Sequence, residues 1–395
     1  MAKLSKIEWT DSTWNPIRFR VKANAAQIAR DKSYTSLVPI AKKMAGRIGQ
    51  HCEHVSAGCK HCYAETNNHR CLPANGTGLP YDRRNRDLVD PFIDEKVLLQ
   101  PLKWGPVLEP CLGCKDALAK GVIDSTDGCS SLESRPRRIF PMNQSDLFGE
   151  WVTDEMLDRI FAVMALCPQH IFQVLTKRPE RMLRYLTAHG RTSEVYNAAT
   201  AIISGDFSRM SSQMASHRSS GDGWWPLPNV WLGVSVENQA AADERIPILL
   251  QTPAAVRFVS CEPMLGTFDL KILKGCPGGI DCTCCHAGCD CGCRDECPKW
   301  LNQRRLDWVI CGGESGPGAR SMQEDWARSL RDQCKAAVVP FFFKQWGEWL
   351  PAMCDGAEGD GQQLNCSDAP VRVGKHAAGS LLDGVEHKQF PEVNR

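Results

Sequence analysis

The feature that most limits the possible folds is a pattern of short apolar segments that each end in polar residues, most of them followed by a helix-like segment. Six such segments are rich in β-branched and aromatic residues, as strands are. They cover residues 138–142, 171–175, 230–234, 256–259, 306–311 and 338–343. Continuously apolar strands that alternate with amphipathic helices indicate a parallel sheet covered by helices.

The segments between these predicted strands carry helix signals. Thr153 is placed to cap a helix with one apolar face, and Pro179 suits the first turn of a second helix. Trp326, Leu330 and Cys334 recur at four-residue spacing and predict a third helix. Neither a GxGxxG nor a Walker motif is present. We therefore predict an α/β fold built as a partial or closed parallel β/α barrel of the TIM type.

The barrel pattern spans residues 1–349 and leaves a C-terminal tail, residues 350–395, to which the residue pattern assigns no chemistry. Four stretches do not follow the alternation, and we interpret them as insertions. They are residues 17–50, 103–134, 190–227 and 274–304. The last is rich in cysteine and is expected to be a metal-binding insertion.

Three cysteines, Cys52, Cys59 and Cys62, lie close together in the string CEHVSAGCKHCYAE. A structural zinc or a cluster held by protein alone needs four ligands, so three thiolates leave a metal position open for a substrate or cofactor. The chain has 21 cysteines, no leader-like start and no run of about 18 apolar residues. We therefore expect reduced thiols, metal binding, a cytoplasmic location and no membrane partner.

A three-cysteine loop after the first strand of a β/α barrel, here expected near residues 7–9, resembles the radical S-adenosylmethionine (SAM) enzymes. More closely, the chain resembles a phage- and prophage-associated, radical-SAM-like family with a three-cysteine motif, often encoded beside a three-Cys-motif partner protein. The strings that carry the resemblance are IEWTDSTWNP, SAGCKHCYAE, MNQSDLF, FQVLTKRPE, WLGVSVEN, SCEPML, DWVICGGESGPGAR, FFFKQWGEW and GKHAAGSLLDG. The six residues between Cys52 and Cys59 depart from the three that are usual in the superfamily.

The resemblance implies a [4Fe–4S] cluster on Cys52, Cys59 and Cys62, with SAM bound to the fourth iron. A reduced cluster would cleave SAM to a 5′-deoxyadenosyl radical, which abstracts hydrogen from a substrate. An electron donor such as flavodoxin or ferredoxin is implied as a partner. The family provides no substrate, but its phage setting suggests a nucleobase or nucleotide of DNA or RNA.

Polar residues at the predicted strand ends are candidate SAM ligands, because these ends form the active-site face of a β/α barrel. A methionine carboxylate needs a cation, which Lys177 or Arg178 could provide. Ribose hydroxyls need an acceptor, for which Glu237 with Ser235 or Asn238 is suited. Ordinary ion pairs at the mouth of the barrel are the alternative.

Two further carboxylates complete the set of candidate cofactor ligands. Asp146 follows the first of the six strands. Glu314 ends a Gly312-Gly313-Glu314 string that is similar to the one meeting the SAM amino group in the superfamily, although here the string follows a late strand.

A second concentration of cysteines indicates a second metal site, either structural zinc or an auxiliary iron–sulfur cluster. It comprises Cys276, Cys282, Cys284, Cys285, Cys289, Cys291, Cys293 and Cys297, and the CxxC pair Cys111 and Cys114 could extend it. We interpret it as a zinc staple, with the iron–sulfur alternative open. Scattered cysteines are expected in the core. They are Cys71, Cys167, Cys261, Cys311, Cys334, Cys354 and Cys366.

Two other functions fit the residues. One is a non-catalytic, zinc-stabilised module that binds nucleic acid or protein, with His51, His54 or His61 as a fourth ligand beside the three cysteines. The other is a hydrolytic zinc barrel with Glu262 or Glu314 as its base, although the chain lacks the HxE pattern of base deaminases. The net charge of +1 argues against a generally basic surface, so nucleic acid would need local basic patches.

Overall fold

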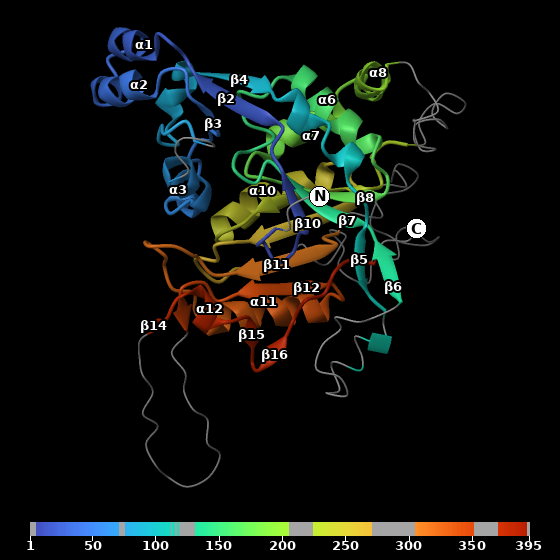
Figure 1. Ribbon diagram of the computed structural model, residues 1–395. Helices are drawn as coiled ribbons and strands as arrows, with labels where there is room; N and C mark the ends of the chain where they lie inside the picture. The colour runs from blue at the N-terminus through green and yellow to red at the C-terminus, as the bar shows by residue number, and fades with distance from the viewer. Residues whose placement is uncertain are drawn as a thin grey trace, which may run out of the picture.

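The computed structural model describes residues 5–70, 76–111, 113–114, 117, 131–204, 224–270, 305–350 and 370–392. Its centre is a parallel seven-stranded sheet in the order β1-β7-β8-β9-β10-β11-β12 (Figure 1). The strands are β1 (Ser12–Trp14), β7 (Arg137–Pro141), β8 (His170–Thr176), β9 (Val230–Ser235), β10 (Val256–Cys261), β11 (Trp308–Gly312) and β12 (Phe341–Gln345). The six apolar segments correspond to β7 through β12, so the predicted α/β class and parallel sheet are confirmed.

The sheet is curled into a half-barrel whose concave face is filled with aromatic side chains. The ring of Trp9 lies 4.7 Å from that of Phe140 on β7 and 6.3 Å from that of Phe258 on β10, although β8 and β9 separate these strands. Trp308 on β11 continues the cluster to Phe342 on β12 at 6.0 Å. Among the described residues, β1 and β12 are the edge strands of the sheet. The barrel is therefore partial, and side chains pack its interior.

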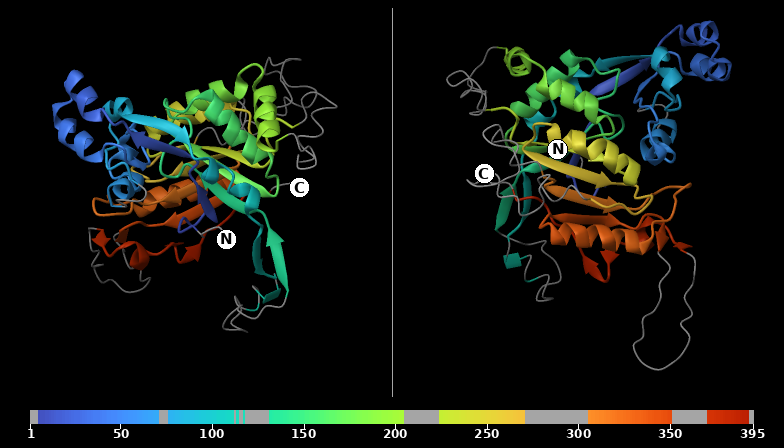
Figure 2. Two further views of the ribbon diagram at one scale, coloured as in Figure 1. Left: turned by 45° about the horizontal axis from the view of Figure 1, so that its top comes forward. Right: turned by 180° about the vertical axis from the view of Figure 1, so that it is seen from behind.

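Helices cover the other face of the sheet (Figure 2). They are α6 (Asp154–Ala165), α7 (Pro179–Thr187), α10 (Gln239–Gln251) and α11 (Glu324–Ala336), while α8 (Arg191–Ile202) packs against α6. The predicted signals are confirmed: Thr153 Oγ1 accepts a hydrogen bond from Met156 N at 3.3 Å, and Pro179 begins α7. On α11, Leu330 and Cys334 are buried against the sheet.

A second, antiparallel sheet forms from the stretch that we interpreted as the first insertion. β2 (Ile17–Val21) pairs with β3 (Ile48–Gly49) and with β4 (Val89–Ile93), and α1 (Ala25–Asp31) and α2 (Val38–Met44) lie beside them. Phe19 on β2 is buried in the main core, because alternate side chains of β2 face inward. This stretch is therefore part of the core structure.

The expected first strand near residues 7–9 is wrong. Those residues form a turn, and the first strand is β1, which begins at Ser12. The reason is the indole of Trp9, which packs into the concave face of the half-barrel with 1% of its surface exposed. The three cysteines consequently follow β3 rather than the first strand of the barrel.

The remaining elements are short. They are η1 (Thr35–Leu37), η2 (Ala57–Cys59), α3 (Tyr63–Arg70), η3 (Arg83–Leu88), α4 (Glu95–Leu98), η4 (Pro101–Lys103), the hairpin of β5 (Val107–Pro110) with β6 (Leu132–Arg135), β13 (Trp349–Leu350), β14 (Val371–Arg372), α12 (Lys375–Ala378), β15 (Leu381–Leu382) and β16 (Val385–Glu386). The predicted cysteine-rich insertion lies outside the described residues. No helix of the described part is long and apolar enough to span a membrane.

The C-terminal tail returns to the edge strand β12. Phe343 N donates a hydrogen bond to His387 O at 2.8 Å, and Trp346 N donates to Gly379 O at 3.1 Å. The tail thus covers one open edge of the half-barrel and reaches the ends of the strands.

Candidate functional site

A cavity of about 410 Å³ lies at the carboxyl ends of the main sheet, where active sites of β/α barrels are found. Its walls include residues at or just beyond the ends of five strands. From β8 to β12 these are Thr176 and Lys177, then Ser235, Ser260 and Glu262, Gly313 and Glu314, and Lys344 and Gln345. The predicted convergence of polar strand ends on one face is therefore observed.

The loop that carries the three cysteines forms another wall of this cavity, and Cys52, Cys59 and Cys62 all line it. Gly58 lies against the ends of β8 and β9. A Cβ atom at Gly58 would stand 3.4 Å from Cδ of Glu237 and 3.5 Å from Nζ of Lys177. The loop is therefore docked directly on strand-end side chains.

A second contact holds the loop to the segment after β11. Arg320 donates from Nη2 to Ala57 O at 3.1 Å, within η2 of the loop. The same guanidinium binds both carboxylate oxygens of Glu314, at 2.8 and 2.6 Å. Glu314, a predicted SAM ligand, thus lines the cavity while it also orients Arg320.

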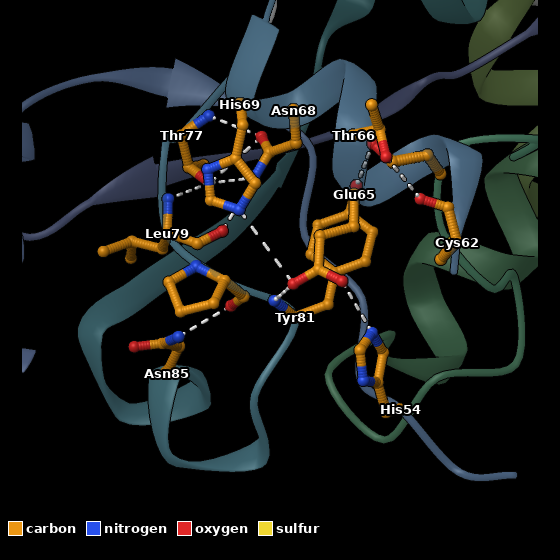
Figure 3. A network of polar contacts seen from close by, with 12 residues as sticks. His54, Cys62, Glu65, Thr66, Asn68, His69, Thr77, Leu79, Tyr81 and Asn85 are labelled. Carbon is orange, nitrogen blue, oxygen red and sulfur yellow. Dashed lines mark hydrogen bonds and ion pairs between the residues drawn. The ribbon is translucent and has the colours of Figure 1, made fainter. Parts of the chain in front are cut away.

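Helix α3 fixes the end of the loop after Cys62, as Figure 3 shows. Thr66 Oγ1 donates to Cys62 O at 3.2 Å. Glu65 accepts from Tyr81 N at 2.8 Å and is bonded to His54 Nε2 at 2.7 Å. These contacts tie α3 to the segment before η3, so the position of Cys62 is set by a polar network as well as by the chain.

Cys52, Cys59 and Cys62 line one cavity, and thiolates are protein ligands both of zinc and of iron–sulfur clusters. Among the described residues, no three His, Cys, Asp or Glu side chains are grouped as ligands of one metal ion. Burial raises the pKa of Cys62, and backbone hydrogen bonds from Glu65 and Ala64 offset this rise only in part.

Asp146 and Arg178 belong to a buried ion network beside Cys52. Asp146 accepts hydrogen bonds from Thr176 Oγ1 at 2.7 Å, Lys177 N at 3.0 Å and Arg178 Nη1 at 2.9 Å. The Arg178 guanidinium also lies 5.0 Å from the ring centre of Trp151. Both predicted ligands line the cavity, but their contacts are mainly with each other and join the ends of β7 and β8.

The other strand-end candidates separate into cavity residues and supporting residues. Lys177 Nζ lies 3.8 Å from Glu237 Oε2, which also accepts from Arg245 Nη1 at 3.0 Å. Burial raises the pKa of Glu237, but Lys177, a hydrogen bond from Ser56 and Arg245 together leave that pKa below its usual value. Asn238 caps α10 by accepting from Ala241 N at 3.0 Å. Of the predicted ligands, those that line the cavity are Asp146, Lys177, Arg178, Ser235 and Glu314.

An ion pair between two partly buried side chains, which are not among the predicted SAM ligands, also lines the cavity. Glu262 Oε1 lies 2.7 Å from Lys344 Nζ, and Glu262 Oε2 accepts from Trp9 Nε1 at 3.2 Å and Ser260 Oγ at 2.9 Å. Burial lowers the pKa of Lys344, but Glu262 outweighs it, so the pKa is raised. A charged residue within the apolar strand β12 is the signal that could have identified Lys344.

The two ends of the chain also contribute to the cavity. Glu8, before β1, and Lys375, at the start of α12, form an ion pair at 2.7 Å, and both line the cavity. Burial raises the pKa of Glu8, but Lys344 and Lys375 leave it lowered. No local pattern joins residues so far apart, so sequence reasoning had no means of pairing them.

Comparison with known proteins places the chain in a family. One family model matches residues 47–391. The chain belongs to DUF5131, a family described as proteins of unknown function. The range of this DUF5131 protein that matches includes the three cysteines and every strand of the main sheet except β1. No curated protein and no solved structure matches the chain.

The histidines that we considered as a fourth ligand occupy different places in this DUF5131 protein. His51 is buried among the rings of Phe19, Tyr81 and Trp151, and burial lowers its pKa to about 3. His54 is bonded to Glu65. Of the three, His61 lines the cavity.

The other cysteines are placed only in part. Cys111 and Cys114 follow β5 and are not among the residues that line the cavity. Cys167, Cys261, Cys311 and Cys334 are buried, which confirms that expectation. The predicted second metal site from Cys276 to Cys297, and the core cysteines predicted at positions 71, 354 and 366, lie outside the described residues.

Proposed function

We propose that this DUF5131 protein is a radical SAM enzyme whose [4Fe–4S] cluster is held by Cys52, Cys59 and Cys62. The observation that carries the proposal is that three cysteines of one loop line a cavity at the carboxyl ends of a parallel half-barrel. When bound, the reduced cluster would supply the electron that cleaves SAM.

Two side chains are best placed to bind SAM. Lys177 can meet the methionine carboxylate, because its contact with Glu237 is long at 3.8 Å and it points to the cavity wall. Arg178 is less suited, because Asp146 already neutralises it at 2.9 Å. Ser235 offers a hydroxyl at the end of β9 for the ribose.

The remaining parts of the site support the loop. Glu237 and Arg320 contact it from two sides, and Asn238 caps α10. A nucleobase or nucleotide of phage DNA or RNA is the substrate that we propose. A flavodoxin or ferredoxin is the proposed reductant, and a three-Cys-motif protein is a proposed partner.

The test is anaerobic reconstitution followed by iron, sulfide and zinc analysis and electron paramagnetic resonance with and without SAM. We expect a [4Fe–4S] signal that changes shape with SAM and is lost in Cys59→Ala. Cys334→Ala is the matched control, since Cys334 is buried on α11 away from the cavity. Zinc alone, with no SAM-sensitive iron signal, would overturn the proposal and favour the zinc-stabilised binding module.

A further inference from the structure

The cavity wall built from the two chain ends carries a row of alternating charges that the proposed cluster chemistry does not use. Lys375 is paired with Glu8 at 2.7 Å, and Lys344 is paired with Glu262 at 2.7 Å. Lys344 also acts on Glu8, whose pKa it lowers. All four residues line the cavity together with Lys6. They come from segments far apart in the chain, so this wall exists only in the folded protein.

The two ion pairs differ in how easily they can open. The side chains of Glu262 and Lys344 are 14% and 18% exposed, and Glu262 holds two further hydrogen bonds, so the pair is fixed. The side chains of Glu8 and Lys375 are 32% and 40% exposed. Exposed ion pairs contribute little and exchange readily. An anionic ligand can therefore displace Glu8 and form an ion pair with Lys375.

A second cation and an apolar surface line the same cavity as Lys375. Lys6 is exposed and has no ion-pair partner among the described residues. Three apolar side chains also line the cavity. Ile7 follows Lys6 in the chain, and Phe140 and Leu175 lie near the ends of β7 and β8. These three side chains belong to the aromatic and aliphatic cluster of the concave face.

We propose that this wall is a subsite for a substrate that carries a carboxylate or a phosphate on an apolar or aromatic body. The anionic group replaces Glu8 on Lys375 and is also contacted by Lys6, while the body lies over Phe140 and Leu175. The role of the subsite in catalysis rests on the proposed function. Lys375 of the C-terminal tail is then a specificity-determining residue.

The exchange predicts opposite effects for two substitutions. Lys375→Met removes the cation, so anion binding should weaken by about tenfold or more. Glu8→Gln removes the group that competes for Lys375, so binding should tighten by about threefold. General damage to the fold does not tighten binding, which makes Glu8→Gln the decisive variant.

The experiment is a titration of the full chain with phenyl phosphate, phenylacetate and the neutral phenylacetamide, followed by ligand-observed NMR at low salt. We expect both anions to bind in preference to phenylacetamide, and the tighter of the two identifies phosphate or carboxylate as the group recognised. Lys335→Met, which removes an exposed lysine at the end of α11, is the control and should bind as the wild type does.

Equal binding of the anions and phenylacetamide, or unchanged anion binding in both Lys375→Met and Glu8→Gln, would overturn the subsite. The result is independent of the cluster. Lys375→Met should keep the SAM-sensitive paramagnetic signal, whereas Cys59→Ala should lose that signal and still bind the anions. Failure of the subsite and failure of the radical SAM proposal are thus separate results.

Discussion

The carboxylate of Glu262 reaches the ammonium of Lys344 at 2.7 Å by crossing the end of β11, the strand that separates β10 from β12. Gly312 makes this crossing possible. A Cβ atom at Gly312 would stand 2.8 Å from Glu262 Oε1, closer than side chains approach. The Gly312-Gly313-Glu314 string therefore leaves room for this ion pair and then supplies Glu314, which binds the arginine that holds the cysteine loop.

We predict that Glu262 and Lys344 are strongly coupled in stability. Lys344→Met should leave the partly buried carboxylate of Glu262 without its cation and lower the free energy of unfolding by about 2 kcal/mol. Combining it with Glu262→Gln should cost clearly less than the sum of the single changes. Urea unfolding of the four proteins measures the coupling, and the exposed pair Arg159–Glu95 should give a coupling below about 1 kcal/mol. Additive effects at Glu262 and Lys344 would contradict the prediction.

The contact between Arg320 and Ala57 should control how firmly the cysteine loop holds iron. Arg320→Met removes the bond to Ala57 O and the partner of Glu314, so the loop loses its attachment to the segment after β11. We expect the reconstituted variant to lose iron to a chelator several times faster than the wild type. Arg159→Met, which also removes an arginine from a bidentate contact but far from the cavity, should match the wild type. Equal rates for both variants would exclude this role for Arg320.

Stability below neutral pH should depend on His170. Burial lowers the pKa of His170, whereas the unfolded chain binds a proton near pH 6.5. The unfolded state therefore takes up more protons as the pH falls below about 6.5, and the folded state loses up to about 1.4 kcal/mol per pH unit from this group.

His170→Gln tests this dependence and can keep the hydrogen bond with Pro101 O, which His170 Nε2 makes at 3.2 Å. The unfolding free energy of the variant should fall less steeply between about pH 6.5 and pH 5. Chemical unfolding at several pH values gives the two slopes. Equal slopes would show that His170 is not a source of acid sensitivity.

Cysteine reactivity should divide the described thiols into two classes. Burial raises the pKa of Cys167 and of Cys334 to about 12, and Cys261 and Cys311 are also fully buried. Iodoacetamide cannot reach these four in the folded, metal-free protein, whereas Cys62 is half-buried and lines the cavity, so Cys62 should be modified even though burial also raises its pKa. Peptide mass mapping before and after unfolding measures each site. Labelling of Cys311 in the folded protein would contradict the burial seen here.

Local patterns predicted most of the main sheet, because continuous apolar strands and amphipathic helices reflect burial that each segment carries in its own residues. The segment at residues 7–9 was wrongly predicted to be a strand, because a local pattern shows that residues are buried but not which backbone conformation buries them. Its apolar residues are buried, but as a turn that places Trp9 in the half-barrel rather than as a strand.

The candidate site was predictable only where residues close together in the sequence indicate a function. Spacing alone indicated Cys52, Cys59 and Cys62, and strand ends indicated Lys177 and Ser235, all of which line the cavity. The sequence did not indicate that Glu237 contacts Gly58 and that Asn238 caps α10, so that neither residue lines the cavity. Which way a strand-end side chain points depends on the partners that tertiary contacts offer.

The sequence by itself determined the α/β class, the strands from β7 to β12 and the three-cysteine motif, since each depends on residues close together in the chain. The tertiary structure alone decided that Glu8 meets Lys375 and that Glu262 crosses Gly312 to reach Lys344. These contacts join segments far apart in the chain, and their partners are selected by the curl of the sheet and the return of the tail. Charge pairing across such distances leaves no periodicity in the sequence.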